Sequence, residues 1–258
     1  MDNPIRLHWL DPRDPQQAFP PVHLAMRDPN GLLAIGGDLS SQRLLRAYAQ
    51  GIFPWYNPNE PILWWCPDPR AVLVPGEFHV SHSLAKRLRK ADFAVTLDSA
   101  FEAVLEACSA PRSHTGGTWL GAEMKQAYRE LHARGFAHSA EVWQEGKLVG
   151  GLYGVALGRA YFGESMFSRA DDASKIALYY LSQQLAAWDF CLIDCQIVSN
   201  HLKTLGAVDI PRERFLLQLR QALQHSGRTG QWGFEIEVPG ERRHRPQFVR
   251  QAYVEHAL

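Results

Sequence analysis

Cysteine is scarce in this chain of 258 residues, which has four: Cys66, Cys108, Cys191 and Cys195. No pair of them has the spacing of zinc ligands together with a matching second pair, and all lie in apolar stretches rather than in a short, loop-rich framework. We therefore expect reduced thiols in the core. The pattern favours neither a disulfide scaffold nor a structural zinc site.

The chain also lacks net charge, because 27 Lys and Arg residues balance 27 Asp and Glu residues. A balanced chain has no global attraction to nucleic acid, so any contact with RNA must come from a local cluster of cations. No apolar run approaches the length that spans a bilayer, and the first residues, Met1 to Pro4, carry no basic and apolar leader. The expectation is a cytoplasmic protein without membrane insertion.

Apolar residues, in contrast, make up 46% of the chain, enough for one large domain or two modest ones with a real core. Up to about residue 69, prolines and glycines break the chain into short pieces. One helix is expected there, between a cap at Ser40 or Ser41 and Gly51. We predict a small N-terminal domain over residues 1–69 and a larger domain over residues 70–258.

The pattern of the larger domain predicts two helices, a hairpin across Glu145 and Gly146, a third strand, a helix and a final strand. The last three elements lie between Tyr161 and Gln196. A strand, a helix and a second strand form a crossover, so the two strands should be parallel and close in one sheet.

Three polar side chains interrupt these two apolar strands. Glu164 lies in the first strand, where a buried carboxylate is costly unless something pairs with it. Two-residue alternation places Asp194 and Gln196 on one face of the second strand, roughly 7 Å apart. Any one of them could simply form a hydrogen bond with an otherwise unsatisfied backbone group, but three on paired strands favour a polar site.

Cations gather in one place, on a helix predicted from Val80 to Lys90 and capped by Ser81 or Ser83. A charge run is usually a solvated face, but this is the densest basic cluster in a neutral chain and favours contact with RNA phosphates. A second cluster, residues 242–245, predicts a solvated tail. The cations of the predicted helix at residues 80–90 are Lys86, Arg87, Arg89 and Lys90.

Aromatic residues are dense between residues 53 and 65, and most of them are typical of core. Trp55 differs because it follows Pro54 in a turn-rich segment. We predict that it is an exposed platform on which a base can stack.

Longer motifs occur in a fixed order along the chain. Pro29–Ala34, Gly36–Ser40, Gly51–Trp55 and Leu63–Arg70 come first, followed by Gly163–Ser168, Ala173–Lys175, Leu192–Gln196, His201 and Leu205–Ala207. Together they resemble the bacterial leucyl/phenylalanyl-tRNA–protein transferases over about residues 19–220. Motifs of this length in this order are far more specific than a short pattern.

The resemblance implies an α+β fold in which a Pro/Gly-rich N-terminal domain precedes a domain similar to the GCN5-like N-acyltransferases (GNAT-like). It implies transfer of leucine, or less readily phenylalanine, from aminoacyl-tRNA to proteins that begin with Arg or Lys, which marks them for degradation as N-degrons. Aminolysis of an activated ester needs no metal and no cofactor. We expect a monomer.

Residue roles follow from the same resemblance. Asp194 and Gln196 are expected to orient and deprotonate the acceptor amine, and Glu164 to bind the acceptor's positive charge. Trp55 is expected to hold the 3′-terminal adenosine of the tRNA, and the basic helix to hold its body through Lys86, Arg87 and Lys90. The candidates for the pocket of the transferred side chain are Leu152, Tyr161 and Met166, with Trp119 at its rim.

Two other classes remain open. An acyl-CoA-dependent N-acyltransferase would normally cradle pyrophosphate in a glycine-rich loop before the crossover helix, but Ser168–Ser174 has no glycine there and contains two aspartates. A non-catalytic RNA-binding module would not require Glu164, Asp194 and Gln196 to converge.

Overall fold

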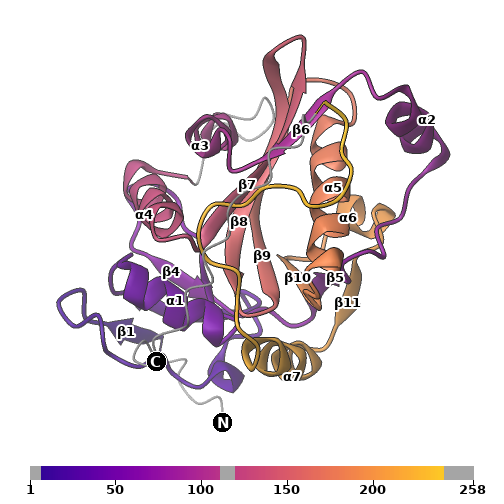
Figure 1. Ribbon diagram of the computed structural model, residues 1–258. Coiled ribbons are helices and arrows are strands. Elements are labelled where there is room, and N and C mark those ends of the chain that lie inside the picture. The colour runs from indigo at the N-terminus through magenta and orange to yellow at the C-terminus, as the bar shows by residue number, and fades with distance from the viewer. Residues whose placement is uncertain (1–6, 111–119, 241–258) are drawn as a thin grey trace.

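The computed structural model describes residues 7–110 and 120–240, and it shows two β-sheets with helices packed around them (Figure 1). The first sheet has four strands in the order β1-β2-β4-β3. The second has seven, in the order β11-β5-β10-β9-β8-β7-β6. The protein is therefore a mixed α+β protein, as expected. Among the described residues, no helix is both long and apolar enough to cross a membrane.

The first sheet and its helix come from the N-terminal part of the chain. The strands are β1 (His8–Leu10), β2 (Leu32–Gly36), β3 (Phe53–Pro54) and β4 (Leu63–Trp65), accompanied by a 3₁₀ turn, η1 (Val22–Leu24), and helix α1 (Ser41–Ala49). The Ser40 hydroxyl accepts a hydrogen bond from the Arg43 N–H and caps α1. Gly51 follows the helix with a left-handed φ of 73°, so the helix predicted here is confirmed.

The second sheet contains the predicted crossover and hairpin. Its strands are β5 (Arg70–Leu73), β6 (Ala94–Leu97), β7 (Ala137–Gln144), β8 (Lys147–Leu157), β9 (Ala160–Ser168), β10 (Leu192–Gln196) and β11 (Val208–Ile210). Strands β7 and β8 form the antiparallel hairpin, and β9 and β10 are adjacent and parallel. Strands β5 and β11 extend the sheet beyond β10, with antiparallel pairing.

Helices cover both faces of this sheet. They are α2 (His82–Lys90), α3 (Phe101–Ser109), α4 (Ala122–Ala133), α5 (Ala173–Ala187), α6 (Asn200–Thr204) and α7 (Arg212–Leu223). Helices α3 and α4 lie on one face and the crossover helix α5 on the other (Figure 1). Neighbouring strand residues accordingly belong to different cores: Tyr153 packs with α3 and α4, whereas Leu152 packs with α5.

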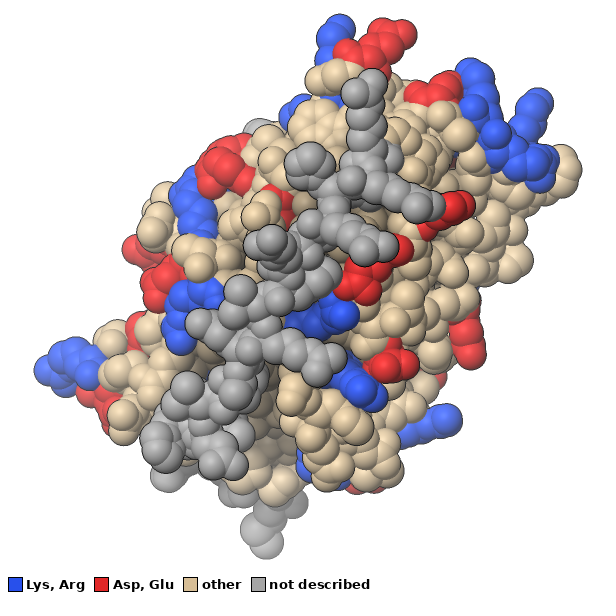
Figure 2. Space-filling model, in the orientation of Figure 1, with Lys and Arg blue, Asp and Glu red and all other residues tan. Residues whose placement is uncertain are grey.

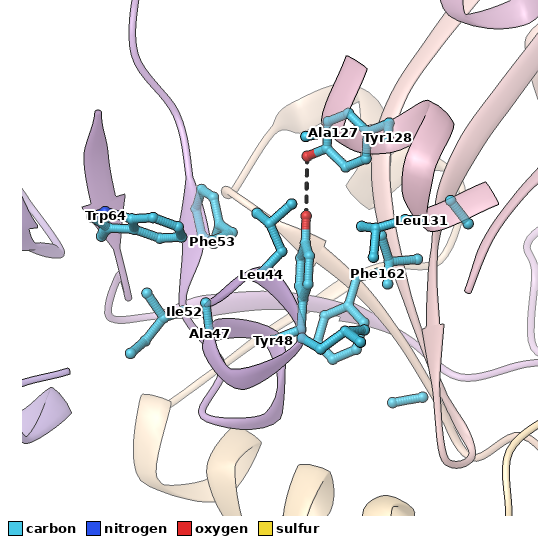
Figure 3. Close-up of a cluster of buried hydrophobic side chains, with 14 of the residues drawn as sticks. Leu44, Ala47, Tyr48, Ile52, Phe53, Trp64, Ala127, Tyr128, Leu131 and Phe162 are labelled. Atoms are coloured by element: carbon cyan, nitrogen blue, oxygen red, sulfur yellow. Dashed lines mark hydrogen bonds between the residues drawn. The ribbon is translucent and has the colours of Figure 1, made fainter. Parts of the chain in front are cut away.

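The N-terminal part shares a core with the larger sheet. Leu44 and Tyr48 of α1 pack in one cluster with Tyr128 of α4 and Phe162 of β9 (Figure 3). Figure 3 shows the hydroxyls of Tyr48 and Tyr128 facing one another, with 3.0 Å between their oxygens. Buried apolar surface is therefore continuous across the predicted boundary at residues 69 and 70, and the division into two domains stays a prediction.

Candidate active site

A cavity of about 300 Å³ opens against β8, β9 and the end of β10, beside β3. Glu164 and Gln196 provide polar groups on its wall. Three of the four residues predicted for the pocket of the transferred side chain, Leu152, Tyr161 and Met166, line it. Trp119 lies outside the described residues. The other apolar side chains of the wall include Phe53, Trp55, Leu178, Ile193 and Leu202.

Glu164 receives hydrogen bonds from three separate parts of the chain. The Tyr48 hydroxyl donates to Oε1 at 2.8 Å, and the Tyr128 hydroxyl donates to Oε2 at 2.5 Å. The Gln196 side-chain amide donates to Oε1 at 2.9 Å. A carboxylate has about four lone-pair sites, so these donors leave room for about one more, on Oε2.

Burial raises the pKa of Glu164 to about 7, because removal from water disfavours the charged form. The hydrogen bonds from Tyr128 and Tyr48 lower this pKa and offset only part of the burial effect, while the negative charge of Asp194 raises it further. Near neutral pH the carboxylate is therefore divided between its two protonation states. A cation that approached the remaining site on Oε2 would favour the ionised form.

Asp194 is fully buried and is held by Arg70 of β5. The Arg70 Nε donates to Oδ1 at 2.7 Å and Nη2 donates to Oδ2 at 2.6 Å, a two-point contact between planar groups. The Arg70 guanidinium also lies over the rings of Phe53 and Phe215, 4.8 and 4.5 Å from their centroids. The described residues that line the cavity include Gln196 but not Asp194.

The strand changes course between Asp194 and Gln196. The pairing register with β5 shifts there, and Gln196 has a left-handed φ of 63°. The regular alternation expected through Gln196 therefore breaks at a β-bulge, which redirects the side chain that follows. Asp194 and Gln196 are joined by one hydrogen bond, in which the Gln196 backbone N–H donates to Asp194 Oδ1 at 2.8 Å. The Gln196 side chain contacts Glu164 instead.

Trp55 lies at the rim of the cavity with 42% of its surface exposed. Its backbone carbonyl accepts a hydrogen bond from the Trp65 indole at 2.7 Å, and the two rings are tilted, with centroids 5.9 Å apart. The predicted exposure is confirmed. Its role as a platform for adenine stays a prediction.

The predicted basic helix is α2, capped by the Ser81 hydroxyl, and Figure 2 shows its Lys and Arg side chains together at the upper right. Asp92, just after the helix, forms ion pairs with both Arg87 and Lys90. Lys86 and Arg89 are exposed and have no ion pair within the described part of the chain. Cationic surface is therefore present on α2, and Asp92 offsets part of it.

Sequence reasoning missed three residues of this site: Tyr48, Tyr128 and Arg70. The two tyrosines occur in helical patterns typical of core, and Arg70 ends an aromatic and proline-rich motif. No spacing connects Arg70 to Asp194, which is 124 residues away. Within the described residues, no group of three His, Cys, Asp or Glu side chains is arranged to hold a metal ion.

Comparison with known proteins gives consistent matches over most of the chain. Residues 72–220 match the family described as leucyl/phenylalanyl-tRNA protein transferase, and residues 37–68 match the N-terminal domain of that family. A solved structure, L-PGS from Bacillus licheniformis, overlaps 60% of this chain and 50% of its own at 13% identity. Its TM-score of 0.35 is too low to support a structural argument.

Curated relatives with the name leucyl/phenylalanyl-tRNA–protein transferase are much closer. The protein from Alkalilimnicola ehrlichii is 54% identical over 95% of each chain. That from Nitrosomonas europaea is 56% identical over 86% of this chain and 94% of its own, and that from Cellvibrio japonicus is 58% identical over 80% and 87%. This chain therefore belongs to the leucyl/phenylalanyl-tRNA–protein transferase family.

Proposed function

We propose that this aminoacyltransferase moves leucine or phenylalanine from aminoacyl-tRNA to the N-terminal α-amino group of proteins that begin with Arg or Lys, and so marks them for degradation. Transfer from leucyl- or phenylalanyl-tRNA to protein is the activity for which the relatives are named. The preference for a cationic acceptor is supported by Glu164, a cavity carboxylate with capacity for one further donor. Charged hydrogen bonds of that kind contribute about 1.5–3 kcal/mol.

The reaction is attack of the acceptor amine on the ester carbon of the aminoacyl-tRNA. A C–N bond forms, the ester C–O bond breaks, and the ribose oxygen leaves with a proton while the amine loses one. Gln196 is the polar group we assign to the amine. Because its Nε2 is committed to Glu164, the amide offers its oxygen to an amine N–H.

In this proposal Asp194 acts through Gln196, since it accepts the backbone N–H of Gln196 while Arg70 holds both of its oxygens. Orientation of this kind lowers the barrier because the reacting groups are already aligned when they meet. We retain Asp194, Gln196 and Glu164 as the catalytic set.

The donor is assigned to the remaining groups. Leu152, Tyr161 and Met166 would surround the transferred side chain, in an apolar slot that separates similar amino acids by only about 1–3 kcal/mol. Trp55 would stack on the terminal adenine. The cations proposed to meet tRNA phosphates are Lys86, Arg87 and Lys90 of α2.

At the level of the whole chain, we propose a GNAT-like domain over residues 70–258 after a small domain over residues 1–69. The order α3, α4, β7, β8, β9, α5, β10, with the parallel pair β9 and β10, supports it. The enzyme would act as a monomer in the cytoplasm, where aminoacyl-tRNA is found.

The substitution Glu164→Gln tests the acceptor assignment. It keeps the size of the side chain and removes its charge, so use of a peptide that begins with Arg should fall by about 1.5–3 kcal/mol in kcat/KM, roughly 10- to 150-fold. Use of a poor acceptor that begins with Ala should change much less. The measurement is transfer of labelled leucine from Leu-tRNA to each of the two peptides.

The matched control is Glu141→Gln, which neutralises a fully buried carboxylate whose pKa burial also raises to about 7 and which does not line the cavity. The Glu141→Gln protein should transfer labelled leucine to each peptide as fast as the parent protein does. An equal loss with both peptides in Glu164→Gln would remove Glu164 from recognition of the acceptor's side chain. Absence of transfer to either peptide by the parent protein would contradict the function itself.

A further inference from the structure

A second cavity, of about 590 Å³, is lined by residues from α6, from the start of α2 and from the start of α5. Two lysines line it, Lys175 from the first turn of α5 and Lys203 from α6, together with the exposed His79. None of the described residues of its wall is acidic. The motif Ala173–Lys175 brings one of these lysines here, and the reaction described above makes no use of it.

Each lysine has one carboxylate partner outside the wall. Lys175 Nζ lies 2.7 Å from Asp172 Oδ1, and Lys203 Nζ lies 2.5 Å from Asp209 Oδ2. An ammonium group has three N–H donors, so each keeps about two for another acceptor. The side chains remain 33% and 46% exposed. The cavity therefore presents hydrogen-bond donors of positive charge and is suited to a small anion.

The two cavities are neighbours because they share two helices. On α6, Leu202 lines the first cavity and Lys203 the second. On α5, Leu178 lines the first cavity, and Lys175, one helical turn earlier, lines the second. Leu84 of α2 lines the second cavity, and the exposed Lys86 follows it on the same helix. Each of the three helices that contribute to the second cavity thus carries a lysine: Lys175 on α5, Lys203 on α6 and Lys86 on α2.

We infer that the second cavity binds a backbone phosphate of the single-stranded 3′ end of the donor tRNA, between the terminal nucleoside in the first cavity and the contacts on α2. This inference rests on the proposed function for the identity of the RNA. A phosphodiester matches the site because it is a compact anion whose oxygens accept from ammonium groups. Lys175 and Lys203 position the RNA strand and take no part in bond formation.

The test is equilibrium binding of uncharged tRNA as a function of salt, which requires no transfer. The variant replaces both cavity lysines, Lys175→Gln with Lys203→Gln. Loss of the contact with one phosphate of a single strand should flatten the plot of log affinity against log salt by about 0.7 units and weaken binding several-fold at low salt. The matched control, Lys125→Gln with Lys147→Gln, changes the net charge equally at residues that do not line either cavity. It should leave the slope nearly unchanged.

Adenosine, which has no phosphate, should bind the cavity variant as it binds the parent protein. An unchanged salt slope for tRNA in the cavity variant, or an equal change in the control, would overturn the inference. The same holds if inorganic phosphate stabilises the parent protein against heat through these lysines while tRNA binding does not depend on them. If the double variant unfolds, Lys203→Gln alone supplies the answer, with about half the change in slope. A protein that binds tRNA in this way but transfers nothing would contradict the proposed function and leave this site supported.

Discussion

The contact between Arg70 and Asp194 shows how a buried charge is maintained at the scale of single residues. Neither side chain is exposed, so each would be unstable without the other. The pair satisfies both carboxylate oxygens, and Asp194 Oδ1 also accepts the backbone N–H of Gln196 at 2.8 Å. Arg70 thereby helps to position Gln196, which lines the cavity. It does so through Asp194, since none of the hydrogen bonds of the described residues joins Arg70 to Gln196 directly.

The substitution Asp194→Asn separates stability from chemistry at this contact. It leaves the Arg70 guanidinium buried without a counter-charge, which should cost about 3–5 kcal/mol of unfolding free energy. Single-turnover transfer by the folded fraction should fall about a hundredfold, since the orientation of Gln196 depends on this carboxylate. Denaturant unfolding and a rapid transfer assay measure the two effects.

A double variant provides the control for this prediction. Arg70→Met combined with Asp194→Leu removes both charges and should recover part of the lost stability. The rate should stay low, because leucine at position 194 has no acceptor for the Gln196 N–H. Recovery of stability and rate together would mean that the pair has no part in positioning Gln196.

At the scale of single elements, α2 is a basic helix whose charge is adjusted by the residue that follows it. Hydrogen bonds from Arg87 and Lys90 lower the pKa of Asp92 to about 2, so Asp92 is ionised in any assay near neutral pH. Asp92 forms ion pairs with two of the cations that were predicted to bind RNA, Arg87 and Lys90. Exposed ion pairs of this kind are weak and are readily exchanged for a phosphate.

The substitution Asp92→Asn should therefore tighten binding of tRNA, because Arg87 and Lys90 no longer share their charge with a carboxylate. The salt dependence of binding should steepen by as much as about 1.8 units, the value for two duplex phosphates. Lys86→Ala should weaken binding of tRNA and flatten its salt dependence, by about half of that amount. Both effects can be measured by titration of labelled tRNA at several salt concentrations.

Asp189→Asn is a suitable comparison, since it removes one exposed negative charge at the end of α5. Its effect on the salt dependence should be small. If Asp189→Asn tightened binding as much as Asp92→Asn, net charge would explain the result, and α2 would have no specific role in binding RNA.

At the scale of the whole molecule, two buried carboxyl groups make the protein less stable as the pH rises, whereas most carboxyl groups do the opposite. Burial raises the pKa of both Glu141 and Glu164 to about 7, from an ordinary value of 4.5. The hydroxyls of Ser139 and Thr96 donate to Glu141 and offset part of the effect of burial. The folded protein thus holds these two protons more tightly than the unfolded chain does.

The free energy of unfolding should consequently fall as the pH rises from about 4.5 to 7, and then level off. Each group contributes up to about 3 kcal/mol to this loss, because the unfolded chain ionises first. Carboxylates with lowered pKa, such as Asp38 and Glu102, act only at more acidic pH and do not mask the trend. Denaturant unfolding at pH 5 and pH 8 measures the difference.

Glu141→Gln should remove about half of that difference, since glutamine does not ionise and can still accept a hydrogen bond at its amide oxygen. The remaining part should disappear in the double variant with Glu164→Gln. A difference between pH 5 and pH 8 that is the same in all three proteins would show that these groups do not control the pH dependence of stability.

Much of the fold followed from local patterns. The helix after Ser40, the hairpin across Glu145 and Gly146, and the parallel pair on either side of α5 were all predictable and are confirmed. Glu164 could be selected as special because a carboxylate within an apolar strand is conspicuous in the sequence itself. These predictions succeed because periodicity, caps and turns depend on residues that are neighbours in the chain.

The partners of the polar groups depended on tertiary structure instead. The residues that hold Glu164 include Tyr48, 116 positions earlier, and Asp194 is held by Arg70, 124 positions earlier. The bulge at Gln196 follows from pairing with β5, a strand from another region of the chain. The sequence by itself determined the family, the helices and strands, and the central carboxylate. The packing of distant elements into one core decided which side chains meet that carboxylate, because such contacts depend on how the two sheets and their helices fit together and leave no local period in the sequence.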